Sequence, residues 1–284
     1  MSDLKNGLNA LTKKKYEKAF RILSPLAKDG NPSAQYYLGY LLSSGLGVIK
    51  NEKEADKLRI SSIKIFREQA KNGNKEAISK LGRIFVETTD LENDDFMEEL
   101  KWLKLASKNG CRESSFLIGN IYDTGEKPSV ADKSNIFPIK NKKEAFKWFK
   151  ISAEQGMAFG MINVAGWLRL GIGTEQNYKE SFKWYRKSAK QGYSSAQFYL
   201  GNFYLRGTGT PVDIQKATKW YIKAANQGHV IAQYHLGRMY QRGDGVSSNN
   251  EKAAKWFNKA ANQGYILARS SQLTGGNISF EIAS

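Results

Sequence analysis

Seven glycines recur along the 284-residue chain at intervals that set its architecture. They are Gly30, Gly73, Gly110, Gly156, Gly192, Gly228 and Gly264. The last four are each 36 residues apart, and the earlier intervals are 43, 37 and 46 residues. A period of this length predicts stacked helix–turn–helix units, with insertions in the earlier copies. Such a chain offers an extended surface and has no single built-in reactive cleft.

Each recurring glycine precedes a segment with the apolar pattern of a helix, which we call helix A. Small residues stand four and nine positions after the glycine, as Ala196 and Gly201 do after Gly192. A larger side chain at these positions would overpack the contact with a neighbour, so we expect close helix approach there. A glycine fifteen positions on, such as Gly207, predicts the end of helix A. The G-x-G pairs that follow therefore cap a helix, since a phosphate loop would follow a strand.

A second segment, helix B, ends at the next recurring glycine. Five copies carry a tryptophan eight residues before that glycine, and every copy carries an alanine or serine three residues before it. The tryptophans are Trp102, Trp148, Trp184, Trp220 and Trp256. We interpret them as a repeated hydrophobic core; a platform that stacks bases or sugars is the alternative.

The segments 196–228 and 232–264 resemble the Sel-1-like repeat, a relative of the tetratricopeptide repeat. The resemblance rests on the elements A-x-x-x-L-G, G-x-G and A-x-K-W-[FY]-x-K-A-A-x-Q-G at fixed spacing, and it is strongest over residues 142–264. It implies an all-α, right-handed α/α superhelical solenoid of about six helix pairs plus caps. It also implies a non-enzymatic scaffold for other proteins; bacterial relatives serve as adaptors, host-interaction factors or immunity proteins. No catalytic residues come with the family.

The repeat predicts one solenoid domain over residues 1–284. Capping helices occupy 1–30, the repeats 31–264 with a loop insertion at 125–141, and a C-terminal cap and loose tail 265–284. The single cysteine, Cys111, excludes a disulfide framework within the chain. No apolar run is long enough for a membrane span or a secretion signal, so we expect a cytoplasmic monomer or weak oligomer.

The formal net charge is +17, and it is concentrated in the second half of the chain. Residues 142–284 contain 20 basic and 8 acidic residues. Part of this charge is a lysine ridge on helix B, with Lys183 and Lys187 as one example. The ridge is interpreted as a solvated face that keeps the protein soluble, with steering of an acidic partner as the alternative. Nucleic-acid binding is a third, weaker hypothesis, because it requires exposed aromatic residues among the lysines.

One stripe of helix A varies between repeats although the core positions do not. In the solenoids that the resemblance indicates, helix A lines the concave face, and this stripe is rich in aromatic and arginine residues, which anchor protein interfaces. We expect a groove for a protein or peptide there; an ordinary solvated face is the alternative. The predicted partner-binding residues are Tyr36, Tyr40, Arg83, Phe116, Asn120, Arg169, Phe198, Asn202, Arg206, Tyr234, Arg238, Gln241 and Arg242.

No group of residues predicts an enzyme, a cofactor or a metal site. The two histidines, His229 and His235, are six residues apart and do not share a helix face, and His235 is expected at the surface. The acidic residues between 92 and 99 are interpreted as the start of a helix rather than as metal ligands. The leading hypothesis is a protein–protein interaction scaffold or adaptor without a small-molecule substrate. The alternative is an immunity protein that binds and neutralises a bacterial toxin effector.

Overall fold

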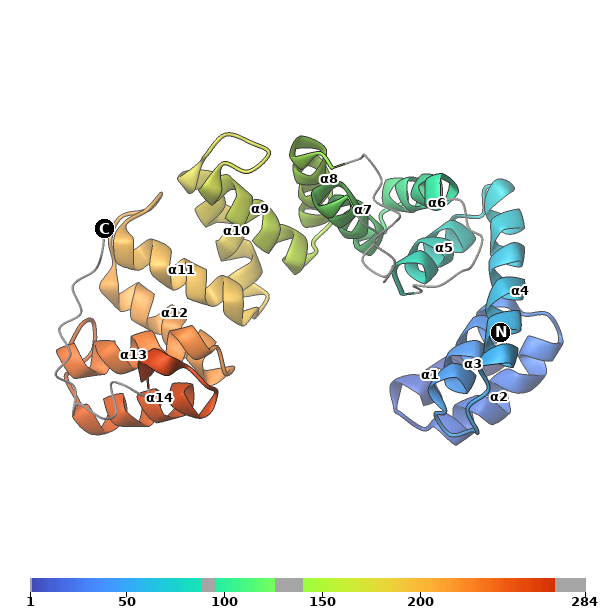
Figure 1. Ribbon diagram of the computed structural model, residues 1–284, viewed down its shortest axis with the longest axis horizontal. Coiled ribbons are helices and arrows are strands. Elements are labelled where there is room, and N and C mark those ends of the chain that lie inside the picture. The colour runs from blue at the N-terminus through green and yellow to red at the C-terminus, as the bar shows by residue number, and fades with distance from the viewer. Residues whose placement is uncertain (1, 88–95, 126–139, 269–284) are drawn as a thin grey trace. The chain divides into compact units, whose positions relative to one another are not determined.

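The computed structural model describes residues 2–87, 96–125 and 140–268 (Figure 1). Within these ranges the chain is helical, with turns between the helices and no strand. The helices are α1 (Ser2–Thr12), α2 (Tyr16–Lys28), α3 (Pro32–Ser44), α4 (Glu52–Lys71), α5 (Lys75–Glu87), α6 (Phe96–Lys108), α7 (Arg112–Thr124), α8 (Lys142–Glu154), α9 (Ala158–Leu170), α10 (Tyr178–Lys190), α11 (Ser194–Arg206), α12 (Ile214–Asn226), α13 (Val230–Arg242) and α14 (Asn250–Asn262). Helix A of the repeats corresponds to the odd-numbered helices from α3 onward, and helix B to the even-numbered ones.

The described chain forms two compact units, and the boundary between them falls inside α7, after residue 118. Within each unit, helices that are consecutive in sequence pack against each other. The predicted α/α solenoid of about six helix pairs after an opening pair is therefore confirmed. One continuous domain over 1–284 stays a prediction. Most of the loop insertion at 125–141 and of the terminal segment at 265–284 lies outside the described residues.

Helix B begins at an asparagine or aspartate in five repeats. The side-chain oxygen of this residue accepts a hydrogen bond from the backbone N–H of the first turn, which otherwise has no partner in the helix. Its own N–H donates to a carbonyl oxygen near the end of the preceding helix A, as Asn177 does to Leu168 at 2.8 Å. One residue therefore starts helix B and ties it to helix A. The five residues are Asn51, Asn141, Asn177, Asp213 and Asn249.

Both glycines of the G-x-G pairs have the left-handed backbone that other residues rarely adopt. Gly207 ends α11 with φ 69°, which confirms the predicted helix cap. Gly209 has a further role, because a Cβ on it would lie 2.5 Å from the carbonyl oxygen of Tyr178, at the start of the preceding helix B. The second glycine therefore lets the turn lie directly on the previous repeat.

In three helix pairs an aromatic ring of helix B lies against a glycine of helix A, at Gly119, Gly201 and Gly237. A Cβ on Gly201 would stand 2.9 Å from the Tyr221 ring, and one on Gly237 would stand 2.7 Å from the Phe257 ring. Tyr221 is fully buried. The ring at this position is Phe149, Tyr185, Tyr221 or Phe257, one residue after the repeated tryptophan.

The tryptophans only partly form the core that the sequence predicts. Trp102 and Trp184 are buried, but Trp148, Trp220 and Trp256 are half-buried. These three residues are therefore less buried than the sequence predicts, and Trp256 packs against the edge of the core. Adjacent helix positions point about 100° apart, and the one that faces the glycine of helix A is buried.

Two adjacent residues of α12 test this assignment. We expect Tyr221→Ala to lower the free energy of unfolding by about 3–5 kcal/mol, because it empties a fully buried position. Trp220→Ala should cost about 1–2 kcal/mol, since less apolar area returns to water. Urea unfolding followed by circular dichroism measures both values. An equal or larger loss for Trp220→Ala would contradict the assignment.

Candidate functional site

Four arginines of the second unit lie on helix A without a carboxylate partner. The helices α9, α11 and α13 contain no aspartate or glutamate. Their arginines form no ion pair with a carboxylate of the described residues, whereas lysines of helix B pair with acidic residues of helix B or its cap. The helix-A face of this unit is therefore positively charged and uncompensated. The arginines are Arg169, Arg206, Arg238 and Arg242.

Arg169 belongs to a stack of side chains that starts at a buried tyrosine of the core. The Tyr185 ring of α10 stacks on Tyr199 of α11 with centroids 4.9 Å apart, and the Arg169 guanidinium lies 5.7 Å from the Tyr199 ring. The buried Nε of Arg169 has no hydrogen-bond partner among the described residues. This stack places a cation over an aromatic ring of the next helix A.

One repeat later, Tyr221 of α12 and His235 of α13 stack with centroids 5.6 Å apart and ring planes 8° apart. Burial, together with repulsion from Arg238, Arg206 and His229, lowers the pKa of the His235 imidazole to about 4. The imidazole is therefore neutral at pH 7. His235 is half-buried between aromatic rings, so the expected surface position is wrong.

The aromatic residues predicted to contact a partner also pack within the unit. Phe198 is buried and stacks on His229, with centroids 4.6 Å apart. Tyr234 is half-buried, and its ring packs against Tyr265 with centroids 5.2 Å apart. In each pair the second residue is the first one after a recurring glycine, so these side chains join successive repeats.

The remaining predicted residues of this face differ in exposure. Asn202 is half-buried and its Oδ1 accepts a hydrogen bond from the Tyr221 hydroxyl at 2.7 Å. Arg206 and Arg242 are exposed, and Arg238 and Gln241 are half-buried. The open part of the face is therefore mainly cationic, above a layer of packed aromatic rings.

The first unit brings two predicted residues together. Tyr36 of α3 and Arg83 of α5 line a small cleft with Tyr37, Phe66 and Lys80. The Lys80 ammonium lies 5.6 Å from the centre of the Tyr37 ring. Tyr40, 47% exposed on α3, does not line this cleft. On α7, Phe116 and Asn120 are half-buried. The predicted set as a whole stays a prediction.

An insertion of two helical turns in α4 places an arginine beside this part of α3. Helix α4 has 20 residues where helix B otherwise has 13, and seven residues make two turns. Phe66 and Arg59 consequently share one face. Phe66 takes the core aromatic position counted back from Gly73, and Arg59 takes it counted forward from the Asn51 cap.

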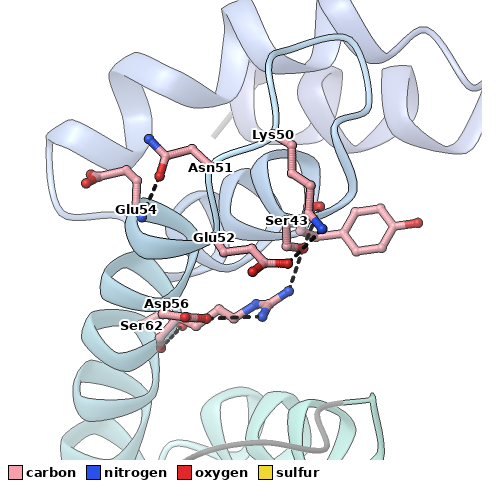
Figure 2. A network of polar contacts seen from close by, with 9 residues as sticks. Ser43, Lys50, Asn51, Glu52, Glu54, Asp56 and Ser62 are labelled. Atoms are coloured by element: carbon pink, nitrogen blue, oxygen red, sulfur yellow. Dashed lines mark hydrogen bonds and ion pairs between the residues drawn. The ribbon is translucent and has the colours of Figure 1, made fainter.

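Arg59 combines an apolar contact with a polar network. A Cβ on Gly39 would lie 3.2 Å from its Cγ, in the place where other repeats hold an aromatic ring. Its guanidinium donates to the Ser43 hydroxyl at 2.6 Å and pairs with Asp56 at 3.5 Å. Figure 2 shows Ser43, Asp56 and the neighbouring Lys50–Glu52 ion pair. The side chain therefore bridges the end of α3 and α4.

The lysine ridge of helix B lies against the tryptophans. Lys187, Lys223 and Lys259 each stand over the Trp ring three residues before them, at 4.2, 4.5 and 4.3 Å from the ring centres. A ring that is partly buried and covered by its own lysine offers little open surface to a base. The geometry of this ridge thus disfavours nucleic-acid stacking.

In the part of the chain that the structure describes, no cluster of three or more His, Cys, Asp or Glu residues could hold a metal ion. The helices of that part are each too short or too polar to cross a bilayer. Cys111 is buried and accepts a hydrogen bond from the Ser114 hydroxyl at 3.1 Å.

Phe66 and Arg59 take the same core position of α4, counted from opposite ends of the helix, and therefore give a matched pair of substitutions. We expect Phe66→Ala to lower the free energy of unfolding by about 3–5 kcal/mol, because it leaves a cavity in the core. Arg59→Ala should cost about 1–2 kcal/mol, since it removes one polar bridge and the packing of an aliphatic stem. Urea unfolding measures both. A larger loss at Arg59 would contradict the assignment of Phe66 as the core residue.

Comparison with known proteins identifies the repeat. The pattern of the Sel1 repeat matches residues 32–55, 136–157, 158–193, 194–229 and 230–265. No curated protein matches the chain.

Two solved structures are similar over most of the chain. One is a protective antigen of uropathogenic Escherichia coli strains with an SLR fold, 28% identical, with a TM-score of 0.68 over 91% of this chain and 52% of that chain. The other is a Sel1 repeat protein from Oxalobacter formigenes, 27% identical, with a TM-score of 0.66 over 92% of this chain and 97% of that chain. The chain thus spans about half the length of the first of these proteins.

Proposed function

Because the chain belongs to the Sel1 repeat family, whose members generally mediate protein–protein interaction, we propose that it is a non-enzymatic scaffold for an acidic protein segment. The segment binds the helix-A face of the second unit. The observation that carries the proposal is the set of arginines on α9, α11 and α13 without ion pairs to the described residues. A partner with carboxylates supplies the negative charge that pairs with these arginines.

Arginine suits this role better than lysine. Its planar guanidinium donates two parallel hydrogen bonds to one carboxylate, which adds orientation to attraction. Below the arginines, Tyr199 and His235 are fixed by stacking on the core tyrosines. A rigid base of this kind lowers the entropy lost when a partner orders the surface. The excess of basic residues over 142–284 accelerates the approach of an acidic partner.

Charge reversal on this face tests the proposal. We expect Arg238→Glu with Arg242→Glu to abolish capture of the native partner, because attraction to its carboxylates becomes repulsion. The matched control is Lys183→Glu with Lys219→Glu, which makes the same charge change on exposed lysines of helix B in the same unit. Affinity capture from the native host with mass spectrometry identifies the partner, and surface plasmon resonance then gives each affinity.

The control variant should retain most of the affinity at about 150 mM salt, where surface charges at long range are screened. Equal losses in the two variants, with helicity intact by circular dichroism, would show that overall charge governs binding and would overturn the assigned face. Retained affinity in the arginine variant would do the same.

The number and affinity of captured partners separates the two specific roles. An adaptor binds several partners with moderate affinity. An immunity protein binds one toxin effector tightly and protects cells that express it. We favour the adaptor, because the arginines are dispersed over α9, α11 and α13, so acidic segments that differ in sequence can pair with different subsets of them.

A further inference from the structure

Within this face, we infer that Arg206 and Arg238 flank His235 and form a subsite that binds one carboxylate of the acidic segment. This inference rests on the proposed function and adds the chemistry of a single anchoring position. Arg206 comes from α11, whereas Arg238 and His235 come from α13, so the subsite joins two successive repeats. Arg238 lies one turn after His235 on α13. Arg206 lies one turn after Asn202 on α11, and Asn202 accepts a hydrogen bond from the hydroxyl of Tyr221, the ring on which His235 stacks.

Aromatic rings hold His235 in place from three sides. Its ring is stacked on Tyr221 of α12, and its centroid lies 5.8 Å from Phe198 of α11 and 6.0 Å from Tyr234 of α13. These contacts fix the imidazole without supplying a negative charge.

The charged and titratable groups around the imidazole come from every helix packed against it. They are Tyr221 from α12, Arg206 from α11, Arg238 and Tyr234 from α13, and His229 just before α13. No carboxylate of the described residues is among them. Two guanidinium groups thus share one site with no counter-charge, an arrangement that a bound carboxylate relieves.

A neutral donor lies on the same helix as Arg206. Asn202 lies one turn before Arg206 on α11, and its Oδ1 already accepts a hydrogen bond from the Tyr221 hydroxyl. The amide nitrogen of Asn202 is left as a donor. The subsite therefore combines two guanidinium groups and an amide, the donors that a carboxylate accepts in pairs.

Occupation of the subsite makes His235 more basic. In the free protein burial and the two arginines oppose its protonation. A bound carboxylate offsets the repulsion from the arginines and favours the imidazolium. The pKa of His235 is then higher in the complex than in the free protein, so binding takes up a proton. Affinity consequently rises as pH falls toward the pKa of the complex, and the gain is lost above it.

The two histidines of the chain make this shift directly measurable. We would titrate the imidazole resonances by NMR with and without hexa-L-glutamate, using His229→Asn to assign them and hexa-L-glutamine as the uncharged probe. The His235 pKa should rise by at least about one unit with hexa-L-glutamate and stay constant with hexa-L-glutamine. A rise of one unit should increase the affinity for hexa-L-glutamate by about 1.3-fold from pH 7.0 to 5.5, where glutamate remains largely ionised, and a larger rise should increase it more.

Two variants separate the subsite from general charge. Arg238→Gln should raise the His235 pKa of the free protein and remove the further rise on addition of hexa-L-glutamate. Arg242→Gln, the matched loss of one charge outside the subsite, should weaken binding but preserve that rise.

Binding of hexa-L-glutamate with no change in the His235 pKa would overturn the subsite and leave the proposed function standing. Absence of hexa-L-glutamate binding would also overturn it. Failure of the proposed function is recognised separately, by unchanged capture of the native partner after charge reversal at Arg238 and Arg242.

Discussion

The contact between a glycine of helix A and an aromatic ring of helix B is the interaction on which the rest of the structure depends. At Gly119, Gly201 and Gly237 the ring lies so close that a Cβ would overlap it. Dispersion is strongest at such short separations, and a dense contact of this kind fixes the crossing of the two helices. The asparagine cap and the second glycine of each G-x-G pair then place the turn. Few further degrees of freedom remain within a helix pair.

The side chains of the proposed binding face are supported by the same core. Tyr221 fills the space at Gly201, hydrogen-bonds to Asn202 and carries His235 on its ring. Tyr185 supports Tyr199 in the same way, and an arginine of the preceding repeat lies near each supported ring. Phenylalanine at the equivalent position, as in Phe257, fills the core but offers no hydroxyl. The identity of the core residue therefore determines whether the surface above it is organised for polar recognition.

The sequence predicts the period, the helix caps and the close packing at glycine, because each depends on backbone geometry that only glycine allows. The sequence does not predict which of Trp220 and Tyr221 is the more buried. Both side chains are large and adjacent, and only the placement of helix A decides which one lies in the core. Phe198 belongs to the variable stripe and is still buried, because it stacks on His229 at the start of the next helix A. The Asn and Asp caps could have been found, as in the 36-residue repeats they stand fifteen residues before the closing glycine.

The α4 insertion shows how such a repeat can lengthen without losing its packing. Seven added residues rotate the helix by nearly two full turns, so Ala55 at one end and Ser62 seven residues later both remain buried. An insertion of two or five residues would turn the core positions toward solvent, because neither is close to a whole number of turns. The same addition creates a second core position, which Arg59 occupies. An arginine is tolerated there because its stem covers Gly39, the Ser43 hydroxyl accepts a hydrogen bond from its guanidinium, and Asp56 pairs with its charge. Lengthening by whole turns thus adds polar groups beside the helix-A face while the stack itself continues.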